Sequence, residues 1–222
     1  MTATYEETLD YLQQHYLTLE QLAERSGLAP AQLEALIAGG LMPGHSHEAT
    51  FSLTIYARVN GHHPTEVRRV RYYHPDLVEL ATVADTVAKD LSPADAAAAI
   101  RSRHDDAVRQ ASSLQADDPA LRALADDAWV WRDGTIGVCL QRFSPADIVR
   151  KTAAVEALAA ALEQAASEGP TSVDRYRLDA ALAAYAAVAG PFGPHERGSS
   201  TRARIYEPAR ALAARIERRA IA

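Results

Sequence analysis

The residues best suited to chemistry lie near the C-terminus, in a loop that leads toward a helix. The loop reads Pro191-Phe192-Gly193-Pro194-His195-Glu196-Arg197-Gly198, and it is followed by Ser200, Thr201, Arg202, Ala203 and Arg204. Glycine and proline are typical of loops, and a serine or threonine is a suitable cap for the helix that follows. Residues 192–222 hold seven arginines against three glutamates, a net charge of +4 in a chain whose net charge is −6.

This loop has the residue types to bind an anion and to move a proton. A helix N-terminus with adjacent arginines is a good anion site, so we predict that Arg197, Arg202 and Arg204 bind substrate. His195 beside Glu196 offers a base and a neighbour that tunes it, and we predict both as catalytic. The alternative is a basic C-terminal helix that forms salt bridges with the acidic remainder of the chain.

A second group of candidates immediately precedes Pro75. Arg68, Arg69 and Arg71 are followed by Tyr72 and Tyr73, and guanidinium groups beside phenol groups can clamp a phosphate, sulfate or carboxylate. We predict Arg71, Tyr73 and His74 as substrate-binding residues. The alternative is the solvated face of a strand.

The histidines and the single cysteine give weaker indications of a functional site. His45, His47, His62, His63 and His74 could hold zinc or copper, yet their spacing matches no known ligand signature, and scattered surface histidines explain them better. Cys139 is interpreted as a buried structural cysteine. We therefore predict no metal ion and no cofactor.

The elements that position these residues are predominantly helices. Proline stands at the first helical position after a turn or capping residue four times, at Pro30, Pro93, Pro119 and Pro145. The patterns predict helices over 4–15, 18–25, 30–38, 76–89, 93–112, 119–126, 145–167, 174–189 and 203–219. The predicted fold class is mainly α, with an N-terminal helix-turn-helix and one or two short β-hairpins.

Two short segments interrupt the helical pattern. Apolar residues alternate with mostly polar ones from Phe51 to Val59 and run into Asn60-Gly61, which indicates a hairpin. The segment from Trp129 to Leu140 turns at Asp133-Gly134 and is a candidate for a second one.

Composition excludes several function classes. The net charge of −6 draws the molecule neither to nucleic acid nor to an anionic membrane. One cysteine permits no intramolecular disulfide, and we find neither a signal-peptide pattern nor a run of about 20 apolar residues. We expect a cytoplasmic protein without membrane contact.

The N-terminal residues 18–38 have the pattern of a helix-turn-helix. A capping box joins Thr18 and Gln21, Gly27 is suited to the left-handed turn, and the segment is similar to the start of MerR-like regulators. Residues 18–41 nevertheless carry Arg25 against three glutamates, and the second helix has no cation. We therefore expect no DNA binding, and we divide the chain into a helix-turn-helix module (1–44) and a helical main domain with a small β-ribbon (45–222).

Three motifs resemble an uncharacterised bacterial family of natural-product-biosynthesis proteins, a domain of unknown function. They are Leu17–Leu22, the stretch Trp131–Cys139, and Pro194-His195-Glu196-Arg197 with Ser200 and Arg202. The family often has an aromatic residue where Ile136 stands and a Lys-Glu pair where this chain has Lys151-Thr152.

The resemblance implies a tailoring or accessory protein that acts on an anionic, amino-acid-derived intermediate. The implied reaction is aziridine formation, in which an amine displaces a neighbouring sulfate on a carrier-protein-bound substrate, and the protein would be one of two dissimilar subunits. Whether the chain is itself an enzyme stays open. The alternatives are a helix-turn-helix regulator and a non-catalytic partner subunit.

Overall fold

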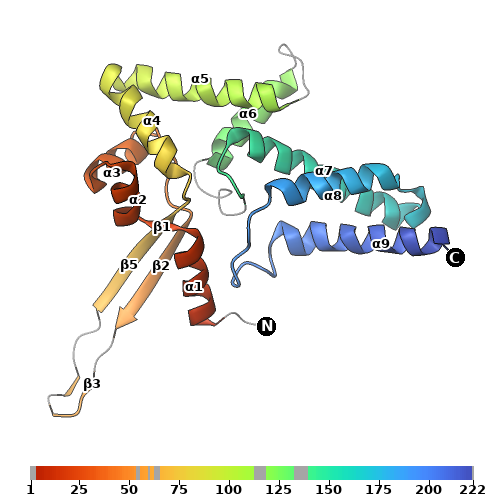
Figure 1. Cartoon of the computed structure of the whole chain (residues 1–222), viewed down its shortest axis with the longest axis horizontal. Helices are drawn as coiled ribbons and strands as arrows, with labels where there is room; N and C mark the ends of the chain where they lie inside the picture. The colour runs from red at the N-terminus through yellow and green to blue at the C-terminus, as the bar shows by residue number, and fades with distance from the viewer. Residues whose placement is uncertain are drawn as a thin grey trace. The chain divides into compact units, whose positions relative to one another are not determined.

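The computed structural model describes residues 4–53, 56–59, 61–62, 66–112, 119–132 and 140–221. The fold is mainly helical with a small three-stranded antiparallel sheet, as the sequence predicts. The chain forms two compact units (Figure 1). The sheet unit comprises Leu12–Ile100, and the helical unit comprises the described residues of Met1–Tyr11, Arg101–Arg132 and the chain from Leu140 onward. The predicted boundary after residue 44 lies inside the sheet unit, and that division stays a prediction.

The sheet unit is built from short helices and a long strand pair. Its elements are α1 (Tyr5–His15, shared with the helical unit), β1 (Leu17–Thr18), α2 (Leu19–Ser26), α3 (Pro30–Ala38), β2 (His47–Leu53), β3 (Tyr56–Ala57), β4 (Gly61–His62), β5 (Glu66–Tyr73) and α4 (Leu77–Asp90). The sheet has the order β1-β5-β2, and β3 and β4 pair separately around the predicted turn (Figure 1). The hairpin prediction is confirmed, although its first strand begins at His47 and Asn60 lies outside the described residues.

The helices α2 and α3 have the ends that the sequence predicts. The Gln21 N–H donates to Thr18 Oγ1 (3.4 Å), the Thr18 N–H donates to Gln21 Oε1 (2.9 Å), and Gly27 has a φ of 71°. These bonds satisfy donors that a helix N-terminus leaves unpaired. The two helices are confirmed; that they form a MerR-like helix-turn-helix stays a prediction.

The sequence did not indicate β1. Its two residues pair with Tyr73 and Tyr72 of β5, and Thr18 also caps α2. A strand of two residues has no detectable alternation, so only a pairing partner reveals it. Because β1 covers this edge, β5 is the central strand of the sheet.

The helical unit consists mainly of long helices. They are α5 (Pro93–Ala111, shared with the sheet unit), α6 (Pro119–Arg132), α7 (Pro145–Ser167), α8 (Arg175–Val188) and α9 (Glu207–Ile221), with a 3₁₀ turn at Pro170–Ser172 and a π-helical turn at Arg202–Tyr206. All four predicted proline starts are confirmed.

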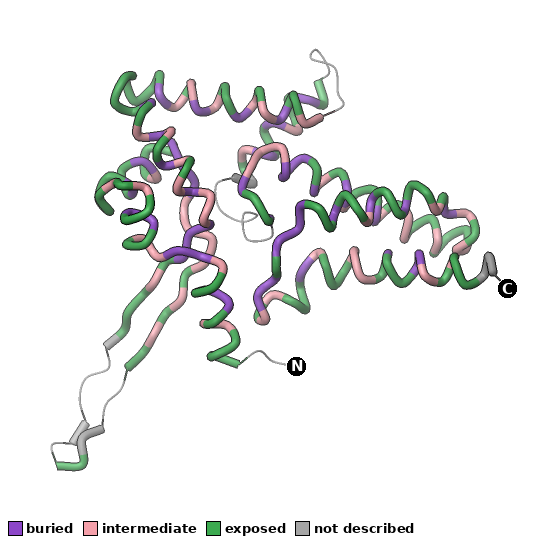
Figure 2. Tube along the Cα trace, in the orientation of Figure 1, coloured by how far each residue is buried: buried purple, intermediate pink, exposed green. Residues whose placement is uncertain are grey.

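Two apolar clusters hold this unit together. One joins α7, α8 and α9 around Leu158, Leu178 and Tyr185, which are almost completely buried. The other joins α5, α6 and α7 around Val108, Leu121 and Ile148. Buried positions recur along these helices with exposed positions between them, as amphipathic helices require (Figure 2).

The predicted second ribbon is wrong at its start. Helix α6 continues to Arg132, so Trp129 is helical. The indole ring lies edge-on to the His104 ring (centroids 5.0 Å apart), and the Arg101 guanidinium lies 5.0 Å from the indole centroid. Ala125 and Ala128 are buried and Trp129 is half-buried, and their helical spacing places them on one face of the continued α6. Residues 133–139, with Cys139 and most of the central resemblance motif, lie outside the described residues.

None of the helices among the described residues is both long enough and apolar enough to cross a membrane.

Candidate functional site

The loop between α8 and α9 is held against other segments of the helical unit at its start. At its start Leu140 and Ala189 form an antiparallel bridge, and the Gln141 N–H donates to the Val188 carbonyl (2.9 Å). The Tyr11 hydroxyl donates to the Pro191 carbonyl (3.0 Å). These bonds hold residues 189–191 against two segments that are distant in sequence.

Gly190 is the position in this segment with the least room for a side chain. A Cβ atom there would lie 2.5 Å from the Leu140 carbonyl oxygen and 2.8 Å from its carbon, and backbone atoms cannot turn aside. We expect Gly190→Ala to lower the free energy of unfolding by about 1–3 kcal/mol, the usual effect of overpacking. Urea unfolding measures it. Gly198→Ala is the control because a Cβ atom there meets nothing within 4 Å, and equal losses in both variants would contradict the prediction.

Within the loop, Glu196 is the residue with the most unusual environment. The Gly193 N–H donates to Glu196 Oε2 (3.3 Å), and the carboxyl is half-buried. Burial raises the pKa of the Glu196 carboxyl, while His195, the Gly193 hydrogen bond and Lys151 act in the opposite direction. A carboxyl with a raised pKa is a stronger base, which is what proton abstraction near neutral pH requires.

His195 lies beside this carboxyl and is exposed. Its ring packs on the Gly193 backbone so closely that a Cβ atom at Gly193 would lie 2.5 Å from His195 Cε1. The Tyr11 ring lies edge-on at 6.2 Å. Both predicted catalytic residues therefore lie in one turn of the loop, where each could exchange a proton with a ligand.

Two basic side chains lie over the ring of Phe192, a residue of this loop. The Lys151 ammonium lies 5.6 Å from the ring centroid and the Arg202 guanidinium 5.7 Å from it, distances at which a cation is attracted to an aromatic face. Lys151 is only 4% exposed. The loop thus has a buried positive charge in addition to its exposed arginines.

Sequence reasoning did not propose Lys151 as a site residue. The signal was available, because Lys151 stands three residues after Ile148 and seven before Leu158, on the apolar stripe of α7. A lysine on a buried stripe is rare unless it has a partner.

The arginines of the basic segment divide into two groups. Arg210 pairs with Glu207 of the same helix (2.8 Å), and Glu217 pairs with Arg175 of α8 (3.7 Å). The salt-bridge alternative requires arginines of this segment to pair with carboxylates elsewhere in the chain, and neither of these two pairs is of that kind. Arg197, Arg202 and Arg204 form no ion pair with any carboxylate that the structure describes, and all three are exposed. Their positive charge is available to an external anion.

The helix that follows begins with a π-helical turn. Ser200 Oγ accepts the Ala203 N–H (3.2 Å) and donates to the Arg197 carbonyl (2.9 Å), so Ser200 is the cap. The buried Tyr185 ring stacks on Tyr206 (centroids 4.8 Å apart), and its hydroxyl lies 3.2 Å from Thr201 Oγ1. Short π-helical turns at helices are frequent at functional sites. Here the turn places Arg202 over both Phe192 and Tyr206.

The other predicted substrate-binding residues belong to the sheet unit. Arg71 and Tyr73 line a pocket of about 510 Å³ between β5 and the helices α2 and α3. His74 is buried outside that lining, where its Nδ1 accepts the Asp76 N–H (3.2 Å).

Three histidines of the sheet unit contact tyrosines. His47 lies edge-on to Tyr16 (4.6 Å), His74 lies 6.3 Å from the same ring, and His45 lies 6.3 Å from Tyr73. The His62 side chain and His63 lie outside the description. These contacts give three of the histidines a packing role.

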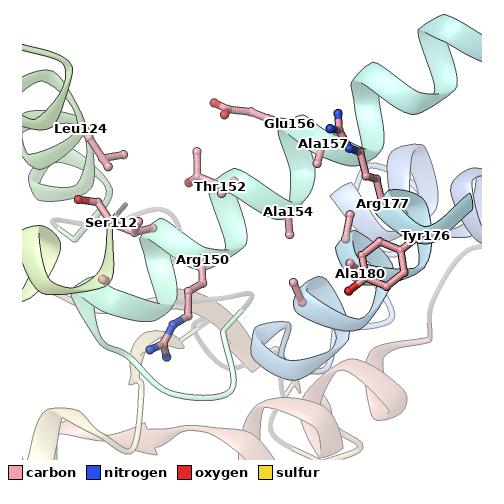
Figure 3. Close-up of a pocket in the computed structure, with 15 residues that line it drawn as sticks. Ser112, Leu124, Arg150, Thr152, Ala154, Glu156, Ala157, Tyr176, Arg177 and Ala180 are labelled. Carbon is pink, nitrogen blue, oxygen red and sulfur yellow. The ribbon is translucent and has the colours of Figure 1, made fainter. Parts of the chain in front are cut away.

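A larger pocket of about 780 Å³ lies along α7 and α8 (Figure 3). Seven of its fifteen lining residues are alanine, and Arg150, Glu156, Tyr176 and Arg177 also line it (Figure 3). Arg150 is already paired with the buried Asp147 (3.1 Å). The size suits a small apolar ligand. The predicted site residues are not part of this lining.

Comparison with known proteins decides the family. Residues 83–213 match the sequence profile of DUF6058, a family of unknown function. The chain belongs to the DUF6058 family. The match covers α7, α8 and the His195 loop, and it confirms the expected relation to an uncharacterised family. Neither a curated protein nor a solved structure matches this DUF6058 chain.

Proposed function

We propose that this DUF6058 protein is a tailoring subunit of natural-product biosynthesis that binds an anionic, amine-bearing intermediate at the His195 loop. The reaction that suits the loop is displacement of a sulfate by a neighbouring amine, which closes an aziridine ring. The proposal includes a cytoplasmic location, a substrate carried by a carrier protein and a second enzyme subunit.

One observation supports the proposal above all others. Glu196, a half-buried carboxyl of raised pKa, shares its loop with Arg197 and Arg202, which are exposed and form no ion pair with the carboxylates that the structure describes. A base and anion-binding groups on one loop are what an amine nucleophile and a sulfate leaving group need together.

The chemistry balances without an external reagent. The amine nitrogen forms a bond to the carbon that carries the sulfate, and the carbon–oxygen bond breaks with its electron pair leaving on sulfate. The proton lost by nitrogen passes to the Glu196 carboxylate. Arg202 and Arg197 would stabilise the charge that develops on the sulfate oxygens.

The sulfate-binding part of the proposal can be tested without the natural substrate. We expect inorganic sulfate to bind the full chain, and Arg202→Gln to raise its dissociation constant about tenfold, the effect of losing one charged hydrogen bond. Isothermal titration calorimetry at low salt measures it.

Arg218→Gln is the matched control, because Arg218 is an exposed arginine of α9 farther along the chain. Equal weakening by Arg202→Gln and Arg218→Gln would mean that sulfate responds only to total charge, and the loop would lose its role.

A further inference from the structure

The pocket between β5 and the helices α2 and α3 lies in the sheet unit, apart from the His195 loop in sequence. Its volume, about 510 Å³, is within the range of small-molecule sites. Charged side chains of both signs line it, with Arg68, Arg69 and Arg71 from β5, Glu20 from α2 and Glu34 from α3. The proposed displacement of sulfate uses none of the residues that line this pocket.

The strand side of the pocket is cationic. Arg69, Arg71 and Tyr73 are spaced two residues apart on β5, so they lie on one face of the strand. Arg71 pairs across the strands with Glu48 (Nε to Oε2, 3.3 Å). Arg69 stands opposite Thr50 and forms no ion pair with the carboxylates that the structure describes. The Arg69 guanidinium is therefore available to a carboxylate.

The helix side of the pocket is anionic. The pKa of Glu20 is lowered by a hydrogen bond from its own backbone N–H, then by one from the Thr18 side chain, with a smaller contribution from Arg68. Glu20 is therefore ionised near neutral pH. Glu34 is exposed on α3 and is available to a cation.

Tyr73 lines the same pocket as the charged side chains of both signs, and it is 2% exposed. Burial raises the pKa of the Tyr73 hydroxyl, Arg71 lowers it, and Glu34 and Glu20 raise it further. At neutral pH that hydroxyl is protonated and can donate a hydrogen bond.

We propose that this pocket binds a small zwitterion of the α-amino acid class, with its carboxylate toward Arg69 and Arg71 and its ammonium group toward Glu20 and Glu34. A ligand with one charge would leave the opposite side of the pocket unmatched. A nucleic-acid phosphate would meet the two glutamates at close range, which is unfavourable.

The test is calorimetric titration of the full chain at low salt with each standard L-α-amino acid. The best of them is then compared with its analogue lacking the amino group and its analogue lacking the carboxylate. We expect the amino acid to bind at least about tenfold more tightly than either analogue, since each lacks one charged hydrogen-bond partner. Binding by none of the amino acids, or equal binding of the deaminated analogue, would overturn the proposal.

Variants identify the site. Arg69→Gln and Glu34→Gln should each weaken binding of the amino acid about tenfold. Arg25→Gln and Glu24→Gln, which change exposed charges of α2 outside the pocket, should leave it unchanged. Equal weakening by variants and controls would overturn the assignment to this pocket. Anisotropy with a labelled DNA duplex completes the test, because tight duplex binding lost in Arg69→Gln would assign the arginines to nucleic acid instead. Sulfate binding at the His195 loop is measured separately, so either proposal can fail alone.

Discussion

Glu196→Gln is expected to lower the rate of sulfate release from 2-aminoethyl hydrogen sulfate by about 10²–10⁴-fold, the usual contribution of a general base. This small amino sulfate carries the amine and the leaving group on neighbouring carbons. A glutamine oxygen can still accept the Gly193 N–H, so the loop keeps its hydrogen bond while the base is lost. Ion chromatography measures the sulfate, and NMR identifies the aziridine.

The pH dependence separates a lost base from a disturbed loop. The rate of the unmodified chain should rise with pH through a value above the ordinary carboxyl pKa, because burial raises the pKa of Glu196. The Gln variant should lack this rise. Glu163→Gln on the exposed side of α7 is the control, and it should retain both rate and profile. An unchanged rate in Glu196→Gln would remove this carboxyl from the mechanism.

The raised pKa of Glu196 also predicts how the free energy of unfolding depends on pH. A carboxyl whose pKa is raised by folding binds its proton more tightly in the folded state. Its contribution to the free energy of unfolding is therefore present at low pH and is lost as pH rises from the ordinary value toward the raised one. Glu196→Gln should not lower the stability at pH 7, and this keeps the activity loss interpretable.

Tyr185→Ala should cost about 3–5 kcal/mol of the free energy of unfolding, the usual loss for a large core aromatic. Tyr185 is completely buried among α7, α8 and α9, and its ring stacks on Tyr206. Removing the ring leaves a cavity and releases the turn that carries Arg202. Urea unfolding measures the loss, and sulfate titration of the folded variant measures the effect on the loop.

Tyr185→Phe separates packing from hydrogen bonding. It keeps the ring and loses the hydroxyl, which lies 3.2 Å from Thr201 Oγ1, so we expect a loss of about 0.5–1.5 kcal/mol. If Phe is as damaging as Ala, the hydroxyl rather than the stack holds the turn, and our account of this cluster is wrong.

Helix starts and turns were predictable because local residues decide them. Pro145 and Ser144 define the start of α7, and the Asp147 N–H donates to Ser144 Oγ (3.1 Å). Pro30, Pro93 and Pro119 act in the same way, since a proline at the first helical position sacrifices no hydrogen bond. The hairpin was readable in part: Phe51 and Leu53 of the predicted alternation fall in β2, although that strand begins at His47 and Leu53 is 56% exposed.

Errors arose where a distant segment decided the outcome. The Trp129 ring packs against His104 and Arg101 of α5, and this packing favours the helical continuation. Nothing within residues 126–132 indicates these two partners. The two-residue strand β1 exists only because β5 offers it a pairing edge.

For the candidate sites, the sequence by itself determined the chemical inventory: a histidine–glutamate pair, exposed arginines at a helix start and an arginine–tyrosine strand. Only the tertiary structure decided which groups are available and what surrounds them. It buries Lys151 beside Phe192, raises the pKa of Glu196, and faces Arg69 with Glu20 and Glu34 across a pocket. Residue type and spacing are local properties, whereas burial and charge pairing depend on segments that meet only after the chain has folded.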